Sequence, residues 1–244
     1  MFGFQALNDN SSVTISDQYP VLVYSQRGQI VVQNTSVVDR EAVGVAMFAT
    51  PIQQTAPPRL FLRFNSGRHD SCVIYLDMIG SAGNWTGFRV RSGAIGGNTL
   101  PRHVFDYVAC RYSTPTAPTG YGIAVYNASG VPVYKSSDRV VKYTKFTKAW
   151  YRNGNGGMFL NLYPSGITIE DDDYIDTSPF NRGNAHMRID DLQFTSMRML
   201  SGGQRTLALV SQCSISISAL GGPQEVGSTY FCLPICKFPI SQYP

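Results

Sequence analysis

The chain alternates short apolar segments with turns, and this spacing limits its fold more than any other feature. Several segments carry apolar residues at alternate positions and others are continuous apolar runs, and Gly, Pro or Asn stands in most of the connections between them. Such alternation is typical of strands with one buried face, and no segment carries apolar residues at three-four spacing long enough to need a helix. The expected strands are 19–24, 29–34, 43–48, 59–64, 72–78, 85–91, 103–112, 158–163, 166–169, 185–189, 206–210 and 214–218.

This many short strands predicts an all-β fold, an antiparallel β-sandwich or a pair of sandwiches with little helix. Residues 114–120 contain Pro115 and Pro118, which continue neither a helix nor a central strand, and form a Pro/Thr-rich loop or linker. We therefore expect a sandwich-like half over 1–113 and a second β-rich half with an apolar C-terminal arm over 121–244. One continuous domain is the alternative.

Three local features of the second half lead to further expectations. Pro164 and Ser165 predict a turn between two strands. The acidic, polar segment 170–184 predicts an exposed loop. The apolar segment 230–239 is expected to be buried, and its two prolines favour a sheet edge or an extended wrapping segment.

Residues 121–136 have the pattern of a complete β-hairpin, and the start of the chain repeats it. Apolar residues alternate on both arms, and the Asn-Ala-Ser-Gly sequence between them has turn chemistry, since Asn bonds its own backbone and Gly accepts a positive φ. A shift of 119 positions places residues 2–15 on this stretch, which predicts an internal repeat of the hairpin. The shared and turn-forming residues are Gly3, Asn8, Gly122, Asn127 and Gly130.

Composition excludes several classes of function. Charged residues make up 15% of the chain and the net charge is +4, with no run of Lys or Arg, which argues against a nucleic-acid surface. No window reaches the roughly 20 apolar residues of a membrane span. The first residues lack the pattern of a secretory signal, so we expect synthesis in a cytoplasm. The five cysteines lie in apolar runs, and most of them are expected to be reduced core residues.

The sequence offers little catalytic or metal-binding chemistry. His69, His103 and His186 lack a second histidine at zinc spacing, and the Cys232–Cys236 pair has no companion pair. The run Glu170–Asp173 contains the oxygen ligands that calcium prefers but lacks the order of a calcium loop, so a solvated loop is the expectation. We expect no cofactor, no metal and no enzymatic activity.

Carboxylate pairs and nucleophiles give no clear catalytic pattern. Asp77, Asp106, Asp190 and Asp191 leave a pair for glycoside hydrolysis open, although surface ion pairs are the ordinary use of such residues. Ser71 stands near His69 in sequence only, and no Gly-x-Ser-x-Gly segment is present.

Binding residues are better represented. Trp85 stands where a loop meets a strand, so its ring either stacks on a sugar or anchors the loop to the core. Tyr151, Asn153 and Asn155 have the composition of a contact loop and equally that of an ordinary turn.

The second hairpin resembles a signature of small tail-tip and baseplate proteins of long-tailed, siphovirus-like bacteriophages. The matching residues are Tyr121-Gly122-Ile123-Ala124-Val125-Tyr126-Asn127-Ala128-Ser129-Gly130, followed by Tyr134-Lys135-Ser136. In that family the motif stands at the N-terminus and again after a Pro- or Gly-rich stretch, as here. The chain departs from the pattern at Lys135, where Asp is usual, and at Asn10-Ser11, where the first copy would carry Gly.

The resemblance implies a virion structural protein of the viral tail with no catalytic residues to carry over. It implies a location at the distal tail and docking on other tail proteins such as hub, fibre or baseplate subunits. It is also compatible with a homo-oligomer, for instance a trimer, and with a contribution to host attachment through a surface glycan or receptor. The alternative is a receptor- or glycan-binding adhesin that acts on its own.

Overall fold

Every regular element in the described part of the chain is a β-strand. The computed structural model describes residues 5–7, 13–16, 19–34, 41–64, 72–94, 102–112, 121–150, 160–179, 185–187, 192–200, 206–213 and 232–244. The strands of the first half are β1 (Gln5–Leu7), β2 (Val13–Ser16), β3 (Leu22–Asn34), β4 (Glu41–Ile52), β5 (Arg59–Phe64), β6 (Cys72–Ser81), β7 (Asn84–Ala94) and β8 (His103–Tyr112). Those of the second half are β9 (Ala124–Tyr126), β10 (Pro132–Lys135), β11 (Tyr143–Thr147), β12 (Leu160–Thr168), β13 (Asp173–Asp176), β14 (Ala185–Met187), β15 (Leu192–Leu200), β16 (Thr206–Cys213) and β17 (Leu233–Lys237).

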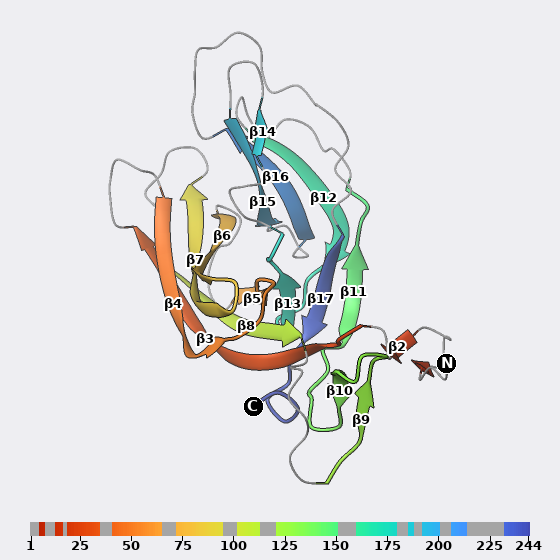
Figure 1. The fold of residues 1–244 in the computed structure, drawn as a ribbon. Coiled ribbons are helices and arrows are strands. Elements are labelled where there is room, and N and C mark those ends of the chain that lie inside the picture. The colour runs from red at the N-terminus through yellow and green to blue at the C-terminus, as the bar shows by residue number, and fades with distance from the viewer. Residues whose placement is uncertain are drawn as a thin grey trace.

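Thirteen strands form one large, strongly curved antiparallel sheet, and two hairpins stand apart from it (Figure 1). Its strand order is β11-β17-β13-β5-β8-β3-β4-β7-β6-β15-β16-β12, and β14 pairs with β15. The hairpins are β1–β2 and β9–β10. The predicted all-β, antiparallel, sandwich-like class is confirmed, and strands of both halves of the chain share the large sheet.

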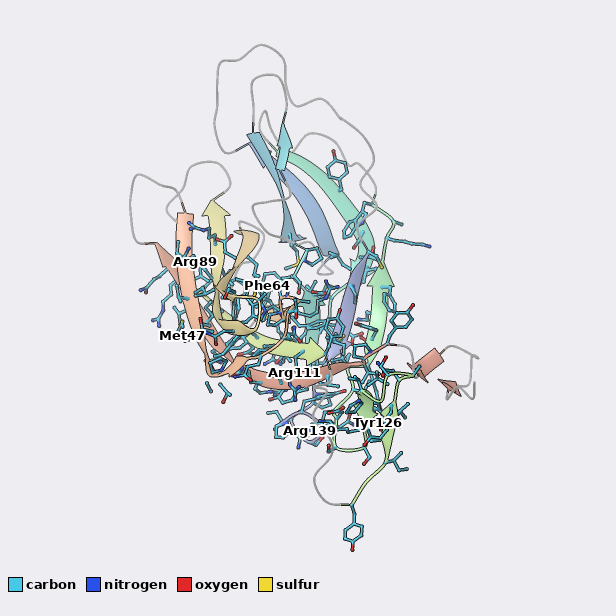
Figure 2. The ribbon with its side chains drawn as sticks, viewed as in Figure 1. Met47, Phe64, Arg89, Arg111, Tyr126 and Arg139 are labelled. Atoms are coloured by element: carbon cyan, nitrogen blue, oxygen red, sulfur yellow. The ribbon has the colours of Figure 1, made fainter. Side chains whose placement is uncertain are left out.

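The concave side of the sheet holds the main core. Side chains of β5 alternate between two cores on opposite faces of the sheet. Leu60, Leu62 and Phe64 belong to the main core, whereas Phe61 belongs to a second core. In Figure 2 Phe64 lies inside the curve and Met47, which is 59% exposed, lies outside it. The second core contains Phe61, Val108, Cys110, Val141, Tyr174, Cys236, Phe238 and Tyr243.

The acidic segment is not a simple exposed loop, because part of it forms β13. This strand lies between β5 and β17, and all four of its residues are buried. Asp173 is bonded by Lys145, and Asp176 by Arg59, so each buried carboxylate has a cationic partner. The expectation of an exposed loop over 170–184 is therefore wrong for 173–176.

Two other local expectations also need correction. The predicted turn at Pro164-Ser165 is absent, because β12 runs through both residues and its irregularity comes after Pro164, near Gly166 with φ of 72°. The C-terminal apolar segment does not form a sheet edge, since β17 pairs with β11 on one side and β13 on the other. The expected strand at 214–218 lies outside the described residues.

The two hairpins have the same backbone register. β1 pairs with β2 as Gln5↔Ser16, Ala6↔Ile15 and Leu7↔Val13, with an irregularity between Ala6 and Leu7. Adding 119 to each number gives the β9–β10 register, which is Ala124↔Lys135, Val125↔Tyr134 and Tyr126↔Pro132, with an irregularity at the matching place. The predicted repeat of the hairpin is thus present in the backbone.

The repeat extends to the large sheet. β4 pairs with β7 from Glu41↔Gly93, and the same shift of 119 gives Leu160↔Gln212, the first pair of β12 with β16. The pair β3–β8 has a bulge after Tyr24↔Cys110, and β11–β17 has one after Tyr143↔Cys236. β6–β7 corresponds to β15–β16, and β5–β8 to β13–β17. We call such matching elements counterparts.

Counterpart strands also join the two halves to each other. β5 pairs antiparallel with its counterpart β13, and β6 with its counterpart β15. The first residues of β3 meet the segment that precedes β11 through an antiparallel bridge, Val23↔Val140, beside which Val141 N–H donates to Leu22 O. Antiparallel pairing of like with like is the pattern of a local two-fold axis, so the halves are arranged as two copies of one unit.

Candidate functional site

The β9–β10 hairpin is the element that carries the sequence signature, and one of its faces is anchored to the body of the protein. Val125, Pro132 and Val133 are buried. Val21 N–H, just before β3, donates to Val133 O at 3.3 Å, which attaches the outer side of β10 to the large sheet. The anchored face leaves the tip and the β9 side accessible.

Asn127 organises the turn of this hairpin. Its Oδ1 accepts hydrogen bonds from Ser129 N–H at 3.0 Å and Val131 N–H at 2.9 Å. The backbone adds bonds from Asn127 N–H to Val131 O and from Gly130 N–H to Asn127 O. Gly130 has φ of 72°, a left-handed conformation that glycine adopts without a Cβ penalty. Both residues therefore have the turn roles expected from the sequence.

Gly122 and Ser136 close the other end of the hairpin. Ile123 N–H donates to Ser136 Oγ at 3.1 Å, and Ser136 N–H donates to Ile123 O at 2.8 Å. A Cβ on Gly122 would stand 2.6 Å from that Oγ, so a side chain here would force the Ser136 hydroxyl to move. The glycines, the asparagine and the serine of the signature are thus structural residues.

The apolar side chains of the hairpin that do not face the body are exposed. Tyr121 is fully exposed, Ile123 is 69% exposed and Tyr126 is 46% exposed, and Val131 at the turn is also exposed. Tyr126 lies on the β9–β10 hairpin, outside the curve of the large sheet (Figure 2). We call these four exposed residues, Tyr121, Ile123, Tyr126 and Val131, the hairpin patch. Ile123 and Tyr126 stand three positions apart, so they face opposite sides of the strand and flank its edge.

The first hairpin is described only through the backbone of β1 and β2. Gly3 and Asn8, the predicted counterparts of Gly122 and Asn127, lie outside the described residues. The sequence places Phe2, Phe4 and Leu7 at the positions of Tyr121, Ile123 and Tyr126. Large apolar residues therefore stand at the same three positions of both copies.

Trp85 is half-buried, and its ring is tied to the protein. Its indole N–H donates to Gln54 O at 3.0 Å, and the side chain packs against the main core. This geometry corresponds to the anchoring role that the sequence left open beside sugar stacking. Tyr151, Asn153 and Asn155 lie outside the described residues.

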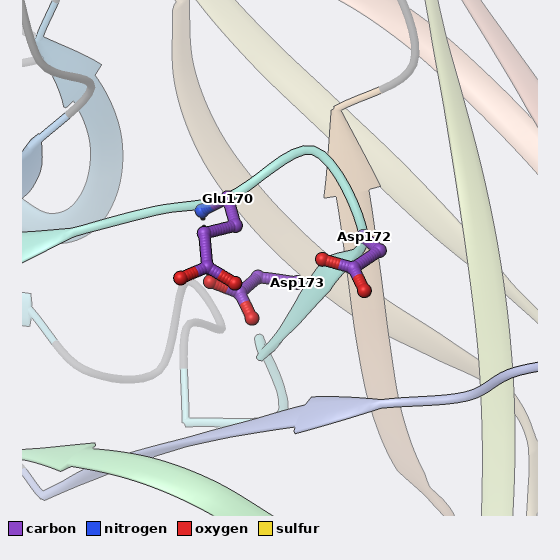
Figure 3. Close-up of side chains that lie close together, drawn as sticks. All are labelled: Glu170, Asp172 and Asp173. Atoms are coloured by element: carbon purple, nitrogen blue, oxygen red, sulfur yellow. Dashed lines mark hydrogen bonds between the residues drawn. The ribbon is translucent and has the colours of Figure 1, made fainter.

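Glu170, Asp172 and Asp173 form the acidic cluster near the start of β13 (Figure 3). One oxygen of each lies within 4.8 Å of the others. Lys145 Nζ lies 2.7 Å from Asp173 Oδ2 and 3.3 Å from Glu170 Oε1, and Lys237 bonds Glu170 and Asp172. Hydrogen bonds from Lys237 lower the pKa of Asp172, and those from Lys237 and Lys145 lower that of Glu170. Two ammonium groups thus hold the oxygens that a cation would need.

Asp77 and Asp106, two of the candidate catalytic carboxylates, form ion pairs with arginines. Asp77 Oδ2 lies 2.9 Å from Arg91 Nε. Asp106 accepts from Arg63 Nε at 3.0 Å and from Gln29 Nε2 at 2.8 Å. Asp190 and Asp191 lie outside the described residues. The described pairs are structural, since each carboxylate is bonded by an arginine on a neighbouring strand.

The described histidine and cysteine side chains show how burial acts on titration. Burial lowers the pKa of His103 and raises that of Cys110 and Cys236. Cys232, by contrast, is exposed, and all three cysteines are free thiols. Neutral, buried thiols are poor nucleophiles and poor metal ligands, which suits the expected core role.

Comparison with protein families, curated proteins and solved structures yields no match for this chain. Among the residues that the structure describes, no helix has the length and apolarity of a membrane span. The hairpin patch and its repeated framework are therefore the features from which a function is argued.

Proposed function

We propose that the protein is a non-enzymatic virion structural component of a bacteriophage tail tip or baseplate. It docks on other tail proteins, such as hub, fibre or baseplate subunits, and contributes to host attachment. On this proposal the chain is made in the host cytoplasm and reaches the outside as part of the particle.

The observation that supports the proposal is that the signature residues stabilise the hairpin. The hairpin depends on Gly122, Asn127, Gly130 and Ser136, so each of these residues has a structural role. The apolar residues between them stay exposed, which is the arrangement of an element presented to a partner. The same hairpin stands at the head of each half with the same register.

Immunogold labelling tests the location. Antibodies raised against the full chain are applied to intact particles of the phage that encodes it, with antibody pre-absorbed on the purified chain as control. We expect gold at the distal end of the tail. Gold on the capsid or along the tube, or its absence from particles, would overturn the proposal.

A cell-binding assay separates this role from that of an independent adhesin. The isolated full chain is incubated with host cells and with their purified surface polysaccharide. A structural component that acts within the tail gives no saturable binding alone. Saturable binding by the isolated chain to the cells or to the polysaccharide would favour the adhesin instead.

A further inference from the structure

The outer edge of β9 has no strand partner among the described residues. β9 pairs with β10 alone, and the other side of β10 is attached to the body through Val133. Asn127 N–H and Ile123 O point toward β10, where they bond Val131 and Ser136. Backbone groups of successive strand residues point to opposite sides, so the N–H groups of Ala124 and Tyr126 point away from β10. These outward groups are a template for a further strand.

Of the devices that prevent strand addition, β9 carries neither a charged residue nor a proline, although it is only three residues long. Natural proteins protect exposed edges with Lys, other charges or Pro on the edge strand. β9 consists of Ala124, Val125 and Tyr126, and residues 121–134 contain no charged residue. An uncharged edge beside exposed apolar side chains is what a docking edge requires.

The pairing pattern inside the chain indicates which strand fits this edge. Where the two halves meet, a strand pairs antiparallel with its own counterpart, as β5 with β13 and β6 with β15. The counterpart of β9 is β1, yet the two lie in separate two-stranded sheets. The hairpins are thus counterpart elements that the chain does not pair with each other.

We propose that the β9 edge of one copy of this chain pairs with the β1 edge of a second copy. The two hairpins then form a four-stranded sheet between chains, which is more stable than either two-stranded hairpin alone. Exposed apolar residues of the hairpin patch flank the β9 edge, and the sequence carries Phe4 and Leu7 at the positions that correspond to Ile123 and Tyr126. The proposal concerns self-association and does not depend on a role in a phage tail.

Joining β9 to β1 is a head-to-tail contact between unlike surfaces. Each chain carries one surface of each kind, so repeated addition closes into a ring if the rotation allows, a trimer being one example, or otherwise continues as a filament. Blocking one surface therefore leaves the other one intact. This property makes the contact testable with two complementary variants of the full chain.

Ala124→Pro and Gln5→Pro are the matched pair. Each proline removes one outward N–H, and at Ala124 the hairpin bonds between Ile123 and Ser136 remain. We expect the wild-type chain to form oligomers in sedimentation velocity and light scattering, and each variant alone to be a monomer. An equimolar mixture of the two is expected to form a one-to-one dimer and nothing larger, because one intact β9 and one intact β1 remain.

Met47→Ser serves as the control, since it removes a 59% exposed apolar side chain far from the hairpins and should leave the oligomer unchanged. Circular dichroism and thermal melting confirm that each variant folds. If a proline variant does not fold, Tyr126→Lys and Leu7→Lys replace the pair, because a charge blocks an edge without touching the backbone.

Three results would overturn the proposal: a monomeric wild-type chain at its highest soluble concentration, variants that associate like wild type, or a mixture that stays monomeric. Dimers formed by each variant alone would show pairing of like with like, and so would also reject the β9–β1 contact. None of these outcomes bears on the labelling experiment.

Discussion

Asn127→Ala tests whether one side chain holds the signature hairpin together. The substitution removes the acceptor of two backbone hydrogen bonds, from Ser129 at 3.0 Å and from Val131 at 2.9 Å. A hydrogen bond of this kind contributes about 1 kcal/mol net, so the turn should lose about 2 kcal/mol. Such a loss raises the population of the opened turn about 30-fold.

The effect should be local, because β9–β10 is a separate two-stranded sheet. Hydrogen exchange followed by mass spectrometry on the peptide that covers residues 127–135 is the appropriate assay. We expect exchange of Gly130 N–H, which donates to Asn127 O, to accelerate about 30-fold while the thermal midpoint of the large sheet stays the same. Asn127→Asp keeps an oxygen acceptor and is the control. Wild-type exchange rates in Asn127→Ala would refute the assigned role of this side chain.

The remaining predictions concern the sheet and its charges. Gly44→Ala would place a Cβ 2.6 Å from Val31 O, and we expect about 2 kcal/mol or more of destabilisation in urea unfolding, whereas wild-type stability would contradict the close approach. Lys145→Met leaves the buried Asp173 carboxylate without its ammonium partner and should cost about 3 kcal/mol, most of which Asp173→Asn in the same chain should restore. Burial lowers the pKa of His103 from 6.5, so below that pH the unfolded chain takes up a proton that the folded chain does not. Stability should therefore be full above pH 6.5 and fall as the pH drops toward the lower folded value, and His103→Phe should flatten this part of the profile measured by urea unfolding.

Strands with a regular alternation and turns with special backbone chemistry were predictable from the sequence. The β9–β10 hairpin is the best case, since Asn127 and Gly130 act where their chemistry requires. β13 was not predictable, because it is buried on both faces and yet contains Asp173 and Asp176, which are typical of exposed segments. The lysine and arginine that compensate them come from β11 and β5, and such long-range partners leave no local signal.

The full extent of the repeat cannot be found by comparing the two halves of the sequence at a single shift. β1, β4 and β7 match their counterparts at a shift of 119, but Cys110 on β8 corresponds to Cys236 on β17 at a shift of 126. The segment Cys110-Arg111-Tyr112 is echoed by Cys236-Lys237-Phe238, which is the signal that could have revealed it. Because an insertion separates this match from the others, a search at a single shift does not find it.

The order in which the chain is synthesised gives the pairing of counterpart strands a further consequence. β5 and β6 emerge from the ribosome more than a hundred residues before β13 and β15, the strands that cover their edges. During that interval the first half carries two open edges whose proper partners do not yet exist. A neighbouring nascent chain offers the same edges, so chains made on one polysome can exchange halves, and rapid translation or a chaperone that shields the edges would favour correct closure within a single chain.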